Sequence, residues 1–161
     1  EIMFSVVVPP MVAKWGKHAK AGFYPFLAAT SSSEARRIKA DRFHFPYHEE
    51  SIDAQFIETD DKVRIRIFGA GKPILDLSIT PGAWDTTTHL LQGFMMNGEE
   101  RLRTTLQISG DYTMHENEEG EMTLFPHPIT ADLLRHEVSP QPFREHWFKN
   151  GTEVFHMLET I

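Results

Sequence analysis

Apolar and polar residues alternate with a period of two in three short runs between residues 52 and 79, and turn residues separate the runs. Asp60-Asp61 stands between the first two runs, and Gly69-Ala70-Gly71 stands between the second and third. This alternation predicts an antiparallel meander with one buried face. The apolar positions that should share that face are Ile52, Ala54, Phe56, Val63, Ile65, Leu75 and Leu77.

Further strand-like runs cover much of the remaining chain. They are residues 4–8, 23–29, 102–108, 112–116 and 122–125, followed by an expected hairpin of 143–149 and 152–158 around Asn150-Gly151. The runs 112–116 and 122–125 flank an acidic turn at 117–120. About nine or ten strands, with turn signals roughly every ten residues, indicate a barrel or a sandwich.

One helix is predicted with a defined start. Ser31 and Glu34 match a capping box, and residues 35–41 continue as a short helix rich in Arg and Lys. Asp85 is a second candidate cap, for a short helical turn through His89 to Phe94. The three threonines at 86–88 argue against that turn because β-branched residues are poor helix formers.

The helix should end at a corner, residues 43–50, with the sequence Phe-His-Phe-Pro-Tyr-His-Glu-Glu. Pro46 fixes its own φ angle and disfavours helical backbone at Phe45. A rigid corner that carries imidazole, phenol and carboxylate groups is a candidate site. The alternative is that its aromatic rings only fill the core, which applies more to Phe45 than to Tyr47 and His48, whose polar ends need partners.

Composition narrows the function classes. The 161 residues suggest a single domain, 1–161, and the net charge of −7 argues against nucleic acid as the main partner. The absence of cysteine excludes disulfides and thiolate chemistry, and no apolar run approaches the ~18 residues of a membrane span. The first residues lack the basic segment of a signal peptide, so we expect a cytoplasmic protein.

No cofactor or metal is predicted from the motifs. His44 and His48 are four residues apart, but Pro46 between them prevents a helical metal-binding pair. Gly69-Ala70-Gly71-Lys72 is too short for a phosphate-binding loop, and the chain has no Gly-x-Ser-x-Gly motif.

Three passages resemble the acetoacetate decarboxylase-like superfamily. They are the helix and corner from Ser33 to His48, the strand Gly71-Lys72-Pro73-Ile74-Leu75-Asp76-Leu77, and the late passage Gly120-Glu121-Met122-Thr123-Leu124-Phe125-Pro126-His127-Pro128. The resemblance implies a mainly β (α+β) fold. It implies a closed or cone-like antiparallel β-barrel with one short helix, a small-molecule cavity, and often a homo-oligomer.

The resemblance breaks where the decarboxylases have their chemistry. Tyr47 and His48 stand at the positions of the lysine pair that follows Phe-Pro in the family, and a phenol cannot form a Schiff base. We therefore expect acid/base chemistry on an oxo or carboxylic metabolite, with Tyr47 and His48 as catalytic residues. By the family's precedent Tyr47 points inward, and His48 should face the opposite side.

The remaining candidate ligand contacts are Phe45, His44, Arg64, Arg66 and Glu50. Arg64 and Arg66 share one face of their strand and would clamp a carboxylate if that face lines a cavity. The alternative is that both simply face solvent. A non-catalytic barrel that binds an apolar or acidic small ligand is the second function that the sequence leaves open.

Overall fold

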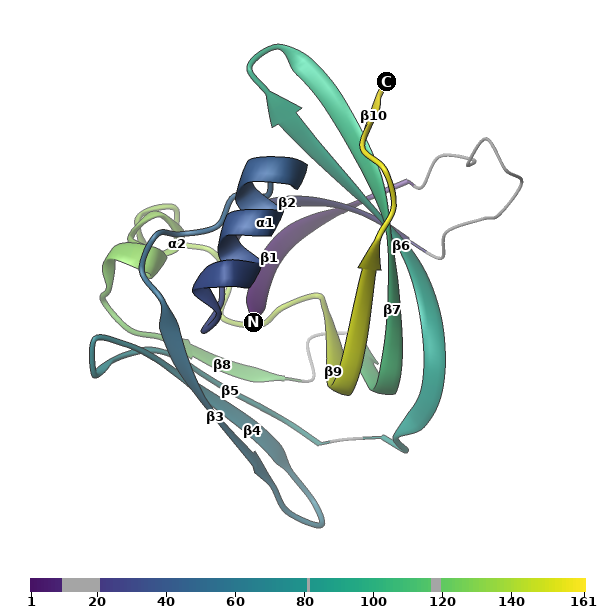
Figure 1. Cartoon of the computed structure of the whole chain (residues 1–161). Coiled ribbons are helices and arrows are strands. Elements are labelled where there is room, and N and C mark those ends of the chain that lie inside the picture. The colour runs from purple at the N-terminus through teal and green to yellow at the C-terminus, as the bar shows by residue number, and fades with distance from the viewer. Residues whose placement is uncertain (10–20, 81, 117–119) are drawn as a thin grey trace.

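The computed structural model of the chain describes residues 1–9, 21–80, 82–116 and 120–161. In these ranges ten strands form two sheets, one of six strands and one of four strands (Figure 1). Of the described helices, the longest is α1 (Ser33–Phe43), and a short turn η1 (Pro128–Thr130) leads into α2 (Ala131–Arg135). None of these helices has both the length and the apolar character needed to cross a membrane. The fold is thus mostly β, as predicted.

The four-stranded sheet contains the predicted meander. β3 (Ile52–Glu58), β4 (Val63–Gly69) and β5 (Lys72–Ile79) pair antiparallel in chain order, and β8 (Glu121–Leu124) pairs with β5. The expected apolar positions do share a face, since Ile65 lies opposite both Phe56 and Leu77. Phe56 is nevertheless 44% exposed, because β3 is an edge strand of this sheet.

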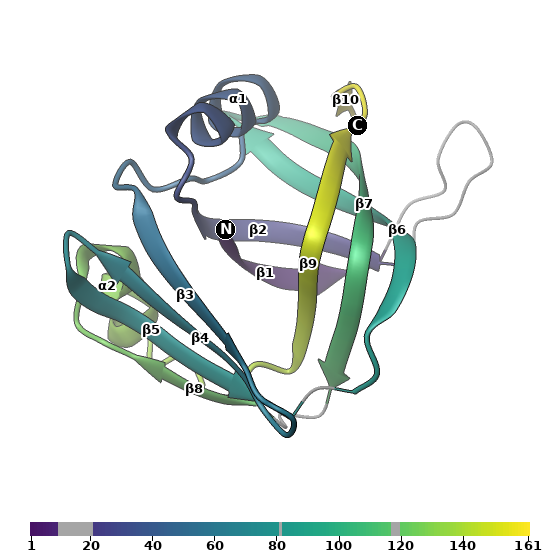
Figure 2. The same ribbon diagram turned by 60° about the horizontal axis from the view of Figure 1, so that its bottom comes forward.

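The six-stranded sheet has the order β1–β2–β6–β7–β10, with β9 also paired to β7. Its strands are β1 (Ile2–Val8), β2 (Ala21–Ala29), β6 (Asp85–Asn97), β7 (Glu100–Glu116), β9 (Arg144–Phe155) and β10 (Glu159–Thr160). β2 pairs with β6 in parallel, so the expectation of a purely antiparallel fold is wrong. In the described residues no strand ladder joins the two sheets, and no closed barrel forms (Figure 2).

Two segments in the middle of the chain are placed by strand pairing and not by their local signals. Residues 85–94 belong to strand β6 and not to a helix, because all 13 residues of the strand pair with β7 and the threonines suit an extended backbone. Residues 112–116 and 122–125 do not pair with each other, because β8 joins the other sheet. Residues 117–119 of the expected acidic turn lie outside the described residues.

Asn150-Gly151 is a bulge within one strand and not the turn of a hairpin. β9 runs through both residues and stays paired with β7 on either side, where Ser109 lies opposite Thr152 and Asp111 lies opposite Lys149. Gly110 faces the bulge, and a Cβ atom there would approach the Gly151 Cα to 2.9 Å. The local turn signal is overridden because both halves of the expected hairpin find the same partner strand.

The N-cap of helix α1 is Ser32, one residue later than the predicted Ser31. The Ser32 hydroxyl, and not that of Ser31, accepts a hydrogen bond from the Ala35 amide at 3.1 Å, so the expected capping box is not formed. The helix ends at His44, whose backbone is left-handed with φ of 56° and whose amide donates to the Ala40 carbonyl at 3.0 Å.

Three apolar clusters hold the elements together. The second of them fixes the corner after α1 against the six-stranded sheet, since buried Phe45 packs with side chains of β6 and β7. The buried members are Ala29, Ile52, Ile67, Ile74, Leu75, Met122 and Ile129 in the first cluster, Phe45, Leu91, Met95, Leu102 and Leu106 in the second, and Val63, Ile79 and Trp147 in the third.

Candidate functional site

The corner at residues 44–50 is attached to strand β2 through its backbone. The His48 amide donates to the Ala28 carbonyl at 2.8 Å, and the Ala28 amide donates to the Pro46 carbonyl at 2.9 Å. Tyr47 lies between these two bonds and forms an isolated parallel bridge with Ala28. This attachment sets the direction in which the Tyr47 side chain leaves the backbone.

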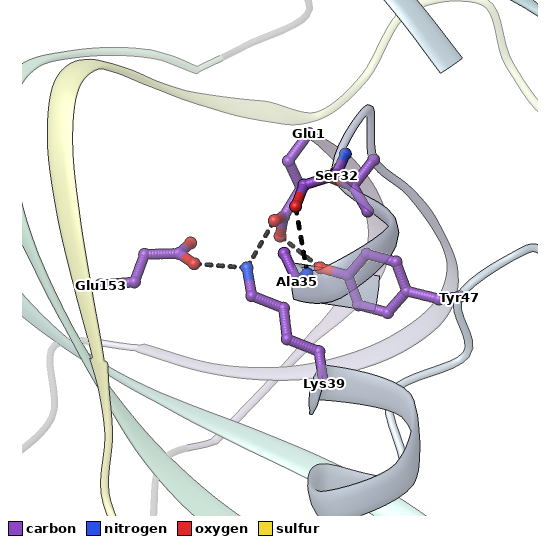
Figure 3. A network of polar contacts seen from close by, with 7 residues as sticks. Glu1, Ser32, Ala35, Lys39, Tyr47 and Glu153 are labelled. Atoms are coloured by element: carbon purple, nitrogen blue, oxygen red, sulfur yellow. Dashed lines mark hydrogen bonds and ion pairs between the residues drawn. The ribbon is translucent and has the colours of Figure 1, made fainter. Parts of the chain in front are cut away.

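Tyr47 belongs to a network of four polar side chains from four segments of the chain (Figure 3). Lys39 of α1 donates from Nζ to Glu1 Oε2 and to Glu153 Oε2 of β9. The Tyr47 hydroxyl donates to Glu1 Oε1 at 2.5 Å. The Lys39 side chain is only 8% exposed, whereas those of Glu1 and Glu153 are 26% and 33% exposed. We call these four residues the Lys39 centre.

The electrostatics of the Lys39 centre keep both donors protonated. Burial lowers the pKa of Lys39, but the charges and hydrogen bonds of Glu1 and Glu153 outweigh it, so that the net pKa is raised. Burial and the Glu1 carboxylate together raise the pKa of Tyr47 far above its ordinary value. Near neutral pH the centre therefore presents an ammonium and a phenol beside two carboxylates, which is a set of proton donors and acceptors.

An open groove of about 630 Å³ lies beside the Lys39 centre, and Tyr47 forms part of its wall. Arg36 and Arg37 of α1 line the same groove, together with the carboxylate-bearing residues Glu34, Asp41 and Glu49. The Arg36 Nη1 atom donates to the Glu49 carbonyl at 2.6 Å, which ties the helix to the corner. Tyr47 thus connects the groove with the buried ammonium.

The structure brings four of the other predicted site residues to this corner, mostly in supporting positions. Phe45 is 3% exposed and meets Phe155 edge-on, as the core-filling alternative expected. His44 caps α1, and His48 Nδ1 accepts from the Glu50 amide at 3.2 Å. The Glu50 carboxylate lies 3.7 Å from His127 Nε2. Catalytic roles for Tyr47 and His48, and ligand contacts at the other three, stay predictions.

Arg64 and Arg66 lie away from the corner, in β4 of the four-stranded sheet. Arg64 donates from Nε to Asp76 Oδ1 at 2.6 Å and from Nη2 to Oδ2, and Arg66 Nε is 3.5 Å from Oδ2. Their side chains are 51% and 43% exposed. Both side chains reach solvent, and Arg64 and Asp76 also line an open pocket of about 450 Å³ on this sheet, apart from the groove at Tyr47. Ligand contacts at Arg64 and Arg66 stay predictions.

Sequence reasoning missed Lys39, Glu1 and Glu153. Lys39 lies in the basic part of a short helix, where a lysine normally faces solvent. A signal was present, because Ala35 and Phe43 are four residues before and after it and place it on the helix face that carries those apolar side chains. Within the described ranges, no group of three or more His, Asp or Glu residues is arranged to hold a metal ion.

Comparison with known proteins supports the fold. No protein-family model matches the chain. The structure of the enduracididine biosynthesis enzyme MppR complexed with pyruvate superposes with a TM-score of 0.53 at 12% identity, covering 98% of this chain and 65% of that one. This chain shares the fold of MppR. At 12% identity the likeness establishes the architecture and not the activity.

A curated relative matches part of the chain only. The ribosomal RNA large subunit methyltransferase E of Pelagibacter ubique (strain HTCC1062) is 32% identical over 77 residues, which are 44% of this chain and 37% of that protein. This chain spans a little over a third of that protein, so the match does not place the chain in that family.

Proposed function

We propose that this protein is an enzyme of small-molecule metabolism that acts on an oxo or carboxylic acid by acid/base chemistry at the Lys39 centre. The observation that carries the proposal is the Lys39 centre itself. It gathers an ammonium, a phenol and two carboxylates beside an open groove. The acetoacetate decarboxylase-like fold of the chain, shared with a small-molecule metabolic enzyme, supports the same class of function.

The arrangement suits the enolisation of an oxo acid. A carboxylate of Glu1 or Glu153 takes a proton from the carbon beside the carbonyl group, and that C–H electron pair moves to form the enolate. The Tyr47 hydroxyl and the Lys39 ammonium donate hydrogen bonds to the enolate oxygen and stabilise its charge. Arg36 or Arg37 in the groove binds the substrate carboxylate. In this route no covalent bond forms between the protein and the substrate.

Pyruvate is the first substrate to test, because the fold neighbour was solved with pyruvate. In D2O, proton abstraction exchanges the methyl hydrogens of pyruvate for deuterium, and ¹H NMR follows the loss of the methyl signal. We expect the protein to accelerate this exchange, and Lys39→Met to abolish the acceleration. Failure to accelerate exchange in pyruvate or in a panel of longer 2-oxo acids would overturn the proposed enzymatic function.

The same samples test whether imine chemistry is absent. Borohydride reduces an imine between a lysine and an oxo acid to a stable amine, which mass spectrometry detects. We expect no adduct on any lysine, because the Tyr47 position lacks an amine and the Lys39 ammonium is held protonated by two carboxylates. An adduct on Lys39 would replace the direct acid/base route with a covalent one.

A non-catalytic binding protein is the second candidate function. It is favoured by the pairing of the Lys39 ammonium with both carboxylates, because these charges have partners within the protein without any substrate. Retention of a 2-oxo acid on the protein, detected by ligand-observed NMR without deuterium exchange, would favour this candidate. Assembly into a homo-oligomer also stays a prediction, and light scattering in solution measures it.

A further inference from the structure

A second pair of titratable side chains lies on the other side of the corner. His127, in the loop before η1, has a side chain that is 3% exposed, and its Nε2 atom lies 3.7 Å from Glu50 Oε1. Its Nδ1 atom accepts a hydrogen bond from the Ile129 amide at 3.3 Å. Because Nδ1 is an acceptor, the ring hydrogen of the neutral imidazole lies on Nε2 and faces the Glu50 carboxylate.

The end of strand β4 packs against the Glu50–His127 pair through Gly69. A Cβ atom at Gly69 would lie 2.8 Å from Glu50 Oε1 and 2.9 Å from His127 Nε2, so a larger residue there would displace the pair. Three segments therefore meet here: the corner through Glu50, the meander through Gly69 and the loop through His127. The loop itself is anchored, because buried Thr130 donates to the Phe125 carbonyl at 2.5 Å and Ile129 packs in the first core cluster.

We propose that Glu50 and His127 are positioning residues that hold the corner, and with it Tyr47, in place against the four-stranded sheet. The backbone bonds of the corner to Ala28 attach it to β2 only. The His48 ring then bonds the Glu50 amide, and the Glu50 side chain reaches His127. This sequence of contacts adds to the covalent connection of the corner to the four-stranded sheet, whose strand β3 begins at Ile52. This positioning role adds to the proposed function. Only its expected effect on activity rests on the proposed function, because the position of Tyr47 is measured without substrate.

Tyrosine NMR tests the positioning without any substrate. The chain has three tyrosines, so ¹³C labelling of tyrosine rings gives a simple spectrum, in which Tyr47→Phe identifies the Tyr47 signals. We expect Glu50→Ala to shift or broaden the Tyr47 signals while those of Tyr24 and Tyr112 stay unchanged. Glu50→Gln should restore the native Tyr47 signals, because its side-chain oxygen fits the place of Glu50 Oε1, 3.7 Å from His127 Nε2.

Thr130→Val is the matched control in the same loop. It removes the hydrogen bonds from the Thr130 hydroxyl to the Phe125 and His127 carbonyls and destabilises the anchor, but it leaves the Glu50 and His127 side chains unchanged. We expect it to lower the melting temperature and to leave the Tyr47 signals unchanged. Unchanged Tyr47 signals in Glu50→Ala, or an equal displacement in Thr130→Val, would overturn the proposal.

Deuterium exchange in pyruvate adds a second readout. Glu50→Ala should lower kcat for exchange about tenfold, because a misplaced donor loses its alignment with the reacting oxygen, and Glu50→Gln should recover most of that loss. Equal kcat values in Glu50→Ala and the unchanged protein would overturn the positioning role even if the proposed function holds. If the protein has no exchange activity, only the proposed function is overturned, because the tyrosine spectra test the positioning role without substrate.

Discussion

A charged cluster is attached to each of the two sheets, and the two clusters differ in both burial and stoichiometry. On the four-stranded sheet, one carboxylate, Asp76, is paired with Arg64 and Arg66, whose side chains are half exposed. Between α1 and the six-stranded sheet, one ammonium, that of Lys39, is paired with the carboxylates of Glu1 and Glu153 and is almost fully buried.

The difference shows why residue types alone do not locate a site. Arginines on a strand suggest a carboxylate clamp, yet water screens the exposed Arg64–Asp76 pair and leaves it little influence on its surroundings. The buried ammonium is screened much less, so it holds two carboxylates in place, and these carboxylates raise its pKa although burial alone would lower it. Four predictions test this contrast between the exposed Asp76 cluster and the buried Lys39 centre.

Lys39→Met should have the largest effect. It leaves two carboxylates side by side without their cation, so we expect the free energy of unfolding in urea to fall by about 2–3 kcal/mol, less than for a fully buried pair because both carboxylates are partly exposed. Lys72→Met is the matched control, since Lys72 is an exposed lysine at the start of β5. An equal loss of unfolding free energy in both variants would show that the burial of Lys39 does not increase its contribution to stability.

Tyr47→Phe should have the next largest effect, on function and not on folding. The ring still fills its space, so the melting temperature should change little. Loss of the hydroxyl should slow pyruvate exchange or weaken ligand binding about tenfold, through the loss of one hydrogen bond in a largely buried site. Tyr24→Phe is the control, because Tyr24 is an exposed tyrosine of β2 outside the Lys39 centre. Equal functional losses at both positions would contradict the assignment of Tyr47 as the inward residue.

The two clusters should respond to opposite ends of the pH scale. The pKa of Lys39 is raised above the ordinary value of 10.5, so its stabilisation is present below that pH and lost as the pH rises through the folded pKa. The hydrogen bond from Arg64 lowers the pKa of Asp76 below 3.8, so its stabilisation is present above that pH and lost as the pH falls through the folded pKa.

Melting temperatures measured over a range of pH test these opposite pH dependences of stability. The difference in melting temperature between the unchanged protein and Lys39→Met should narrow as the pH rises through the folded pKa of Lys39, and the difference to Asp76→Asn should narrow as the pH falls through the folded pKa of Asp76. A Lys39→Met difference that stayed constant in alkaline solution would show that the Lys39 ammonium does not stabilise the folded state.

Arg64→Met should have the smallest effect. The side chain is half exposed and pairs with Asp76 on the outer face of the sheet, so we expect stability and pyruvate exchange to stay close to those of the unchanged protein. Isothermal titration with a 2-oxo acid checks binding in the same variant. A loss of binding as large as that of Tyr47→Phe would show that the predicted arginine clamp is correct and would move the site to the four-stranded sheet.

Local patterns predicted much of the fold and part of the site. The meander was predictable because period-two alternation and turn residues act within a few positions of each other. The start of α1 was predictable only to one residue, because Ser31, Ser32 and Ser33 are all good caps and the backbone selects among them. The corner around Pro46 was also predictable, and Tyr47 takes part in the Lys39 centre.

The partners of these local elements were not readable from the chain. Asn150-Gly151 has the sequence of a hairpin turn, but it becomes a bulge because the flanking residues both pair with β7. Lys39 resembles a surface lysine, but its carboxylate partners lie 38 and 114 residues away in sequence. Burial depends on which segments cover a side chain, and pairing depends on which strands compete for an edge. Burial and strand pairing are both properties of the assembled sheets. They therefore decide which polar side chains come together in the folded protein.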